Sequence, residues 1–183
     1  MNYLVRQEKS EDYDKVRGVL QSAFFRDGKD AVFNEWILVE KIRDSEYYIP
    51  ELSLVAEADG QVVGYILFSP MKIRGANTSF DSLALAPLAV YKDYQKQGIG
   101  KQLVRLGIER AKKLGFKSMV VLGHPDYYSK FGFKRASKWR IGTTEDFNDE
   151  CLFVLELVKD GLRGISGVVQ YCPLFYGENG ELI

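Results

Sequence analysis

Apolar and polar residues follow two different periods along this chain, and the changes between them predict its secondary structure. Residues 2–7 and 52–70 are rich in β-branched and aromatic types, which is typical of strands. Asp59-Gly60 divides the longer segment with the residue types of a tight turn, which predicts a hairpin. Two intervening stretches carry apolar residues at helical spacing and predict two helices. Their apolar positions are Val16, Val19, Leu20 and Ala23, after an N-cap region at residues 10–12, and then Val32, Phe33, Trp36, Ile37, Val39 and Ile42.

The middle of the chain predicts a strand, a loop and a long helix in succession. Residues 80–90 are almost wholly apolar, which favours a central strand buried on both faces. Because Pro87 cannot donate a hydrogen bond to a neighbouring strand, we expect a bulge or interrupted pairing there. Residues 99–115 have an amphipathic pattern that ends at a glycine and predicts a helix. Further strands are predicted at 117–123, 151–158 and 167–171, with a short helix or turn at 124–133.

The order of these elements, βααβββαβαββ, defines the expected fold class. Strands interspersed with helices, with a strand-loop-helix-strand unit at the centre, predict an α/β fold in which helices cover a mixed sheet. The 183 residues contain no internal repeat and no low-complexity linker. We therefore expect residues 1–183 to form a single domain.

The charge balance and the cysteines narrow the functional classes. Lys plus Arg and Asp plus Glu both number 25, so no net charge attracts the protein to nucleic acid or to an anionic membrane. No apolar run approaches the ~20 residues that span a bilayer, and the first residues are too charged for a signal peptide. Cys151 and Cys172 lack the spacing of a zinc site or a disulfide framework. We expect a cytoplasmic protein with two reduced thiols, no metal, and no nucleic-acid or membrane partner.

The loop QKQGIG at residues 95–100 is the candidate for ligand binding. Its two glycines stand at the start of the predicted helix, where unpaired N–H groups and the positive end of the helix dipole favour an anion. A Walker phosphate loop would need glycine and Ser or Thr where the chain has Gln95 and Gln102. A dinucleotide fingerprint would need glycine in place of Leu103. Both motifs are excluded, and the alternative that the glycines only shape a loop stays open at this point.

The surrounding sequence resembles the GNAT acyltransferase superfamily at two places. Residues 85–104 are similar to its acyl-CoA-binding core, in which an apolar strand leads into Q/R-x-x-G-x-G/A at the start of a long helix. Residues 127–133, YYSKFGF, resemble the family's aromatic segment, with Tyr128 four residues before a glycine. Within the superfamily the chain looks most like a bacterial branch of N-acetyltransferases. The three defining positions of the core motif are Gln95, Gly98 and Gly100.

The resemblance covers most of residues 3–158 and implies both fold and partners. It implies a mostly antiparallel central sheet with helices on both faces. The tail at residues 159–183 lies beyond this core, and one further strand in the tail is the open alternative. The resemblance further implies acetyl-CoA, or a related thioester, as co-substrate and an amine of a small molecule or protein as acceptor. The amine would attack the thioester directly while both substrates are bound. Many members of the superfamily pair as dimers, so a monomer and a homodimer both stay open.

The resemblance also implies roles for individual residues. Main-chain N–H groups at the helix start would bind the diphosphate of CoA, and the strand before the loop would pair with the pantetheine arm. The Ala89 N–H would stabilise the thioester carbonyl oxygen. Tyr128 would act as general acid toward the leaving thiolate, and a packing role for this tyrosine is the alternative. The expected cofactor-binding residues are Leu88, Ala89, Val90, Gln95, Lys96, Gln97, Gly98, Ile99, Gly100 and Lys101.

The base that takes the amine proton is not identified by the sequence. Residues 82–90 contain no ionisable side chain, so Glu57, Asp81 and a chain of water molecules are the alternatives. His124 is expected to cap a helix turn. A non-catalytic acyl-CoA sensor is the alternative function. The acceptor pocket is not identified by the sequence either, because one set of apolar side chains either lines it or fills the core. That set is Phe24, Phe25, Trp36, Tyr47 and Tyr48.

Overall fold

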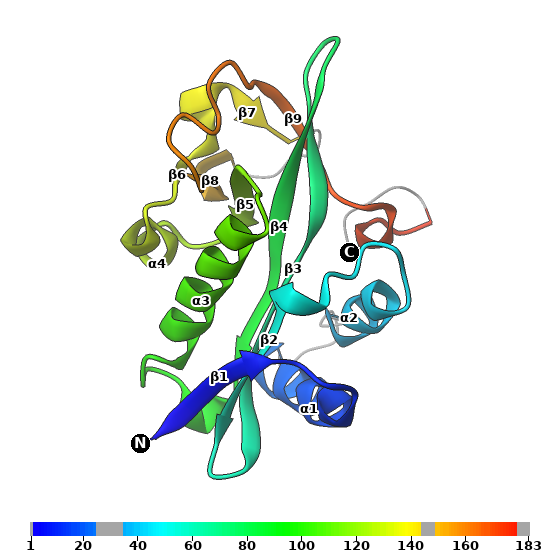
Figure 1. Ribbon diagram of the computed structural model, residues 1–183, viewed down its shortest axis with the longest axis vertical. Helices are drawn as coiled ribbons and strands as arrows, with labels where there is room; N and C mark the ends of the chain where they lie inside the picture. The colour runs from blue at the N-terminus through cyan, green and yellow to red at the C-terminus, as the bar shows by residue number, and fades with distance from the viewer. Residues whose placement is uncertain (1, 25–34, 144–148, 179–183) are drawn as a thin grey trace.

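The computed structural model describes residues 2–24, 35–143 and 149–178. These residues form a sheet of nine strands in the order β1-β2-β3-β4-β5-β8-β6, with β9 pairing with β3 and β7 (Figure 1). The strands are β1 (Tyr3–Gln7), β2 (Ser53–Ala58), β3 (Gln61–Arg74), β4 (Ser79–Val90), β5 (Ser118–Leu122), β6 (Lys134–Arg135), β7 (Ile141–Gly142), β8 (Leu152–Glu156) and β9 (Gly167–Gln170). The α-helices are α1 (Tyr13–Phe24), α2 (Glu35–Arg43), α3 (Ile99–Lys113) and α4 (Pro125–Tyr128).

The sheet is mostly antiparallel, and its one central parallel pair is short. β4 and β5 run parallel and pair at two positions, Leu83 with Met119 and Ala84 with Val120. On its other side β4 pairs with β3 as far as Val90. The edge of β4 that faces β5 is therefore unpaired after Ala84 within the described sheet. The two strands share hydrogen bonds at one end and separate at the other.

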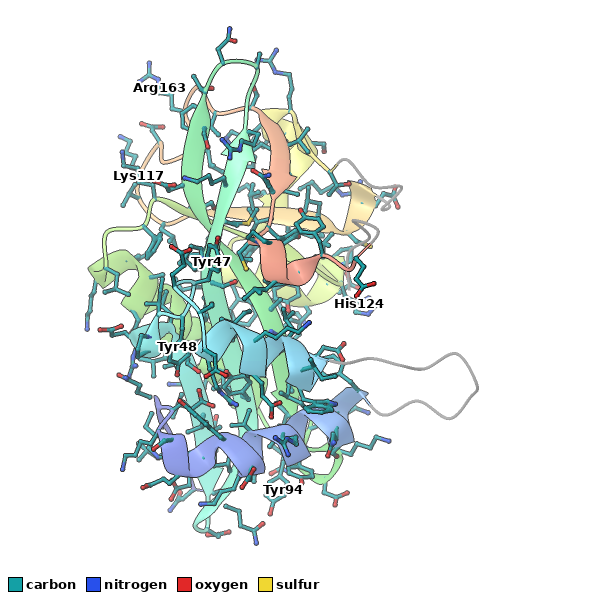
Figure 2. The ribbon with its side chains drawn as sticks, turned by 90° about the vertical axis from the view of Figure 1, so that its right-hand side faces the viewer. Tyr47, Tyr48, Tyr94, Lys117, His124 and Arg163 are labelled. Atoms are coloured by element: carbon teal, nitrogen blue, oxygen red, sulfur yellow. The ribbon has the colours of Figure 1, made fainter. Side chains whose placement is uncertain are left out.

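Helices cover both faces of the sheet. α1 and α2 lie side by side on one face, and α3 runs along the other (Figures 1 and 2). The buried apolar side chains divide in the same way, because Val16 of α1 packs in one cluster with Tyr65, and Leu103 of α3 packs in the other with Phe68. Gly107 brings α3 close to β3, since a Cβ there would lie 2.3 Å from the Phe68 ring. The predicted mixed sheet with helices on both faces is confirmed.

The predicted elements are present, and two short strands were missed. At the predicted hairpin turn, Asp59 and Gly60 adopt φ values of 49° and 76°. β6 and β7 have two residues each, which is too short for any period to be read from the sequence. The tail contributes β9, which pairs with β3. Two apolar positions of the second predicted helix, Val32 and Phe33, lie outside the described residues, and Cys151 and Cys172 are free thiols as predicted.

In the part of the chain that the structure describes, no helix is both long enough and apolar enough to cross a bilayer.

Pro87 interrupts β4 as the sequence predicted. The Ala86–Pro87 peptide bond is cis, and the register of the pairing with β3 shifts between Ile66 and Phe68. Pairing resumes at Leu88. The irregularity lies in the part of β4 that no longer pairs with β5. Within the described sheet, this stretch has no partner strand on its β5 side and a shifted register on its β3 side.

A buried ion pair fixes the end of α2 to the sheet. The Arg43 guanidinium donates to the Glu8 carboxylate, and these side chains are 5% and 0% exposed. Glu8 also accepts hydrogen bonds from Ser53 Oγ at 2.6 Å and from Tyr48 OH at 3.1 Å. Burial, together with the Glu8 charge, raises the pKa of Tyr65, whose OH lies 2.9 Å from Ser53 Oγ. Because a buried charge must be paired, this network determines where α2 ends on the sheet.

We expect Glu8→Ala to lower the free energy of unfolding by about 3–5 kcal/mol, because the Arg43 charge then stays buried without its carboxylate. Urea denaturation followed by circular dichroism measures this change. Glu11→Ala is the matched control, since Glu11 pairs with Lys9 where both side chains are exposed, and it should leave the stability nearly unchanged. An equally small effect of Glu8→Ala would contradict the anchoring role of the network.

Candidate active site

The separation of β4 from β5 leaves an open strand edge in the middle of the sheet, and two cavities border this edge. One lies at the start of α3 and the other lies beneath α1 and α2. Leu88 of β4 lines both of them. The two spaces therefore border the same strand position.

The first cavity, here the α3 cleft, has a volume of about 340 Å³ and lies between the end of β4 and the start of α3. Of the residues expected to bind the cofactor, Ala89 and Gln97 do not line it and the others do. Tyr94 and Tyr127 line it as well, and the sequence did not single them out for this cleft, although Tyr94 directly precedes the glycine-rich loop. The lining residues are Leu88, Val90, Tyr94, Gln95, Lys96, Gly98, Ile99, Gly100, Lys101 and Tyr127.

The start of α3 presents hydrogen-bond donors to this cleft. Gly98 directly precedes the helix with φ of 88°, a left-handed conformation that favours glycine. The Gln102 N–H donates to the Gly98 carbonyl at 3.1 Å, which is the first hydrogen bond of the helix. The N–H groups of Ile99, Gly100 and Lys101 precede it and have no acceptor within the helix. The helix dipole and two lysines add positive potential, and none of the lining residues is acidic. The cleft is suited to an anion.

Two glutamines shape the loop that leads into α3. Gln95 Nε2 donates to the Val90 carbonyl at 3.0 Å, which ties the loop to the end of β4. The main-chain N–H of Gln95 donates to the Lys92 carbonyl at 3.3 Å, so this N–H is engaged within the loop. Gln97 Nε2 donates to the Asp93 carbonyl at 3.2 Å. Both glutamine side chains hold the loop in shape.

The register of β4 determines which of its N–H groups face the open edge. The Tyr91 N–H donates to the Val63 carbonyl at 2.9 Å, so these residues form a hydrogen-bonded pair of the antiparallel ladder. Hydrogen-bonded and non-hydrogen-bonded pairs alternate, so the Ala89 N–H points toward β3 while those of Leu88 and Val90 point away from it. The Val90 carbonyl agrees with this, since it accepts a side-chain bond from the loop. This register does not support the role expected of the Ala89 N–H, because that group is directed into the sheet.

The second cavity, here the α2 cavity, has a volume of about 260 Å³ and is mostly apolar. It lies between β4, the first two helices and the C-terminal segment. Glu35 at the start of α2 is the one acidic residue among those that line it. Its walls are formed by Phe24, Glu35, Leu38, Leu85, Ala86, Pro87, Leu88, Leu122, Tyr128, Tyr171 and Phe175.

Tyr127 and Tyr128 are divided between the two cavities. Their ring centroids are 5.1 Å apart with an interplanar angle of 85°, and Tyr127 lines the α3 cleft while Tyr128 lines the α2 cavity. Tyr128 is 8% exposed and packs edge-on against Phe133. Gly123 leaves room for it, because a Cβ there would lie 2.2 Å from the Tyr128 ring. Burial, with a smaller contribution from Tyr127, raises the pKa of Tyr128, so its phenol is protonated at neutral pH.

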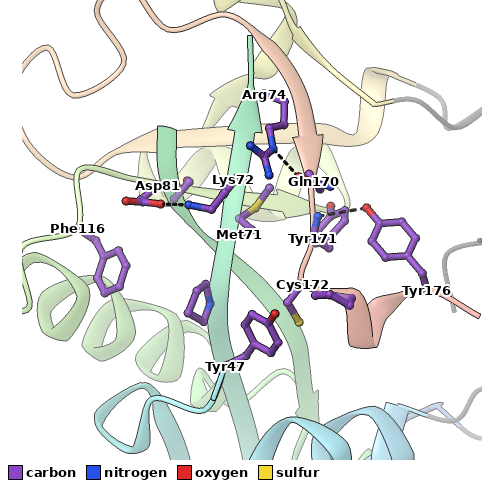
Figure 3. Close-up of a pocket in the computed structure, with 13 residues that line it drawn as sticks. Tyr47, Met71, Lys72, Arg74, Asp81, Phe116, Gln170, Tyr171, Cys172 and Tyr176 are labelled. Atoms are coloured by element: carbon purple, nitrogen blue, oxygen red, sulfur yellow. Dashed lines mark hydrogen bonds and ion pairs between the residues drawn. The ribbon is translucent and has the colours of Figure 1, made fainter. Parts of the chain in front are cut away.

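Neither carboxylate that the sequence offered as a base lines the α3 cleft or the α2 cavity. Glu57 accepts from Arg6 Nε at 2.9 Å, where β2 pairs with β1. Asp81 accepts from Lys72 Nζ at 2.7 Å (Figure 3). Along β4, Asp81 precedes Leu88 by a span of roughly 20 Å at the usual rise of a strand. Neither carboxylate is therefore placed for direct proton transfer beside Leu88.

His124 lies outside both cavities. It occupies the N-cap position of α4 and is exposed at the periphery of the molecule (Figure 2). Its carbonyl accepts the N–H groups of Tyr127 and Tyr128 at 3.1 and 3.3 Å. His124 therefore has the expected N-cap position, but its side chain makes no capping hydrogen bond to α4.

The aromatic set considered for the acceptor pocket is distributed over several environments. Phe24 lines the α2 cavity. Tyr48 belongs to the buried Glu8 network, and Trp36 has the Arg17 guanidinium over its ring at 5.1 Å from the centroid. Phe25 lies outside the described residues.

A third cavity, of about 570 Å³, lies beside β3 and β9, with Tyr47 on its wall (Figure 3). Polar contacts join residues of its wall, namely Lys72 to Asp81, Arg74 Nε to Gln170 Oε1 at 2.6 Å, and the Tyr171 N–H to Tyr176 OH at 3.2 Å. It does not include the open stretch of β4. Across residues 2–24, 35–143 and 149–178, no group of three His, Cys, Asp or Glu side chains is placed to hold a metal ion.

Comparison with known proteins gives sequence relatives over most of the chain. A model of the acetyltransferase (GNAT) family matches residues 11–133. The Escherichia coli (strain K12) protein named uncharacterized N-acetyltransferase YhbS is 33% identical over 169 residues, which cover 92% of this chain and 95% of that protein. Uncharacterized N-acetyltransferase YjhQ of the same strain is 41% identical over 97 residues, which cover 53% of this chain and 54% of that protein.

Solved structures give the same result. The 1.55 Å crystal structure of YhbS from Escherichia coli in complex with CoA has a TM-score of 0.85 at 32% identity, and the match covers 99% of this chain and 97% of that one. A GNAT family acetyltransferase from Brucella melitensis in complex with acetyl-CoA has a TM-score of 0.75 at 32% identity, covering 95% and 98%. Since both the family model and relatives above 30% identity span most of the sequence, the chain belongs to the GNAT acetyltransferase family.

Proposed function

We propose that the protein transfers an acetyl group from acetyl-CoA to an amine, by direct attack of the amine on the thioester while both substrates are bound. The observation that carries this proposal is that the α3 cleft and the α2 cavity both border Leu88, on a strand edge that no other described strand occupies. The crystal structures of two relatives in complex with CoA and acetyl-CoA support the choice of donor. One cavity would hold the donor and the other the acceptor.

The diphosphate of CoA would bind at the start of α3. The N–H groups of Ile99, Gly100 and Lys101 are donors for its oxygens, and Lys96 and Lys101 add positive charge. Charge-assisted hydrogen bonds of this kind contribute on the order of 1.5–3 kcal/mol each. The missing side chain at Gly100 keeps these donors accessible.

The pantetheine arm would lie along the unpaired edge of β4. The main-chain groups of Leu88 and Val90 face that edge, so an extended arm would pair there as an added strand does. We assign the Leu88 N–H, in place of that of Ala89, to the thioester carbonyl oxygen. A fixed donor at this oxygen stabilises the negative charge that develops during attack.

Tyr128 would supply a proton to the departing thiolate. Its phenol is protonated at neutral pH because burial raises its pKa, and it lines the cavity that Leu88 shares with the α3 cleft. With ordinary pKa values of ~10 for a phenol and ~8.5 for a thiol the transfer to sulfur is uphill, and the raised pKa of Tyr128 adds to this cost. The return of a proton from the acceptor nitrogen to the phenol offsets it. When the C–N bond has formed and the C–S bond breaks, the phenol proton goes to sulfur, and a proton released by the acceptor nitrogen restores the phenol.

We expect Gly98→Ala to weaken acetyl-CoA binding about 10-fold or more, since a side chain at this left-handed position shifts the donors at the start of α3. Isothermal titration calorimetry measures the dissociation constant. Gly60→Ala is a matched control, because Gly60 also has positive φ and an open surrounding but lies in the β2–β3 turn. Similar losses of affinity in both variants would show that backbone strain alone is responsible and would argue against the assigned diphosphate site.

We expect Tyr128→Phe to slow thiol release on the order of 100-fold while acetyl-CoA affinity stays unchanged, because only the proton donor is lost. Release of CoA thiol with a reactive amine measures the rate. Since the acid form is active and the pKa of Tyr128 is raised above its usual ~10, its ionisation should not lower the wild-type rate at any pH below about 10.

Tyr47→Phe is the control for this experiment, because it removes a phenolic hydroxyl outside the α3 cleft and the α2 cavity. Its rate should equal that of the wild type. A Tyr128→Phe enzyme with wild-type turnover would leave Tyr128 a packing role.

A further inference from the structure

The walls of the α2 cavity select among possible acceptors. Apart from tyrosines, Glu35 is the one ionisable side chain among the residues that line it, and the other walls are apolar or aromatic. Glu35 Oε2 is buried from solvent. In such surroundings the attraction between opposite charges is stronger than in water. A cation is therefore favoured at this end of the cavity, and an anion is disfavoured.

The aromatic walls favour the same kind of ligand. Phe24, Tyr128, Tyr171 and Phe175 border the cavity together with Glu35. Aromatic faces attract ammonium groups and also bury the apolar carbon atoms that such a group is attached to. At about 260 Å³ the cavity is smaller than the ~300–1,000 Å³ of ordinary small-molecule sites, so it takes a side-chain-sized group.

We propose that Glu35 binds the ammonium group of the acceptor, and that the acceptor is a primary amine carried on a short apolar chain or ring. This inference rests on the function proposed above and names the acceptor class of the same site. Glu35 then takes the first proton of the ammonium, which leaves a neutral amine. The nitrogen attacks the thioester carbon, the C–N bond forms and the C–S bond breaks. Of the two protons that the nitrogen loses, one reaches solvent through Glu35, and the other replaces the proton that Tyr128 gives to sulfur.

Glu35 lies where an acceptor could reach both Tyr128 and the thioester. Pro87 and Leu88 border the same cavity, and Leu88 also lines the α3 cleft, in which the donor is proposed to bind. Neither Glu57 nor Asp81 lines either of these spaces, because each is held by a basic side chain elsewhere on the sheet. Glu35 is therefore the carboxylate that the described cavities bring to the reaction centre.

The test compares two acceptors that differ by one carboxylate. Phenethylamine carries a ring and an ammonium group, and phenylalanine adds an anionic group that Glu35 would repel. We expect the wild-type enzyme to acetylate phenethylamine with a higher kcat/KM than phenylalanine. Glu35→Gln should lower kcat/KM for phenethylamine by about 100-fold and remove most of the preference, without changing acetyl-CoA affinity. A lysine-containing peptide, as a third acceptor, tells whether the aminoalkyl group comes from a protein side chain or from a small molecule.

Glu40→Gln is the matched control, because Glu40 is on the same helix, pairs with Arg17 and does not line the cavity. Its rates and selectivity should equal those of the wild type, and thermal unfolding of each variant verifies that it is folded. Loss of acetyl-CoA binding by the wild type would refute the proposed function itself. Wild-type acetylation of amines with unchanged selectivity in Glu35→Gln would overturn only the role of Glu35. Wild-type binding of acetyl-CoA without acetylation of any amine would refute the proposed transfer and favour the non-catalytic sensor.

Discussion

The candidate active site depends on the separation of β4 from β5 after two residue pairs. In a continuous sheet the N–H and carbonyl groups at the end of β4 would be bound by a neighbouring strand. Here the shared pairing stops at Ala84, and Pro87 disturbs the pairing with β3 a few residues later. The strand edge from Leu88 to Val90 is then open to a ligand. The glycine-rich loop begins where this edge ends, and Gln95 ties the two together.

A second constraint, the buried ion pair at the end of α2, connects the protein interior with the site. α2 is fixed at its C-terminal end by the buried pair of Arg43 and Glu8, while Glu35 at its other end lines the α2 cavity. The helix has the rigidity of one continuous hydrogen-bonded ladder, so the ion pair also sets the height of Glu35 above the sheet. A buried polar network that is costly to form thus positions a carboxylate more than two helical turns away.

Local sequence patterns predicted most of the fold and the α3 cleft, and they were less informative where the site depends on register. The period of apolar residues, the Asp59-Gly60 turn and the motif from Gln95 to Gly100 are local signals, and the structure has the corresponding elements. The direction of the Ala89 N–H depends on which residues of β3 lie opposite, which no local pattern encodes. Glu35 was missed for a related reason, because its relation to Tyr128 arises from distant parts of the chain meeting in one cavity.

Leu88 has a consequence for the order of events during turnover. The space on its α3 side and the space on its α2 side have separate walls, so two molecules that meet at this residue need not pass one another. In the proposed reaction, CoA would be exchanged from one space while the acetylated product stays in the other, and the product would leave while CoA stays. The proposed reaction would then need no fixed order of substrate binding and product release.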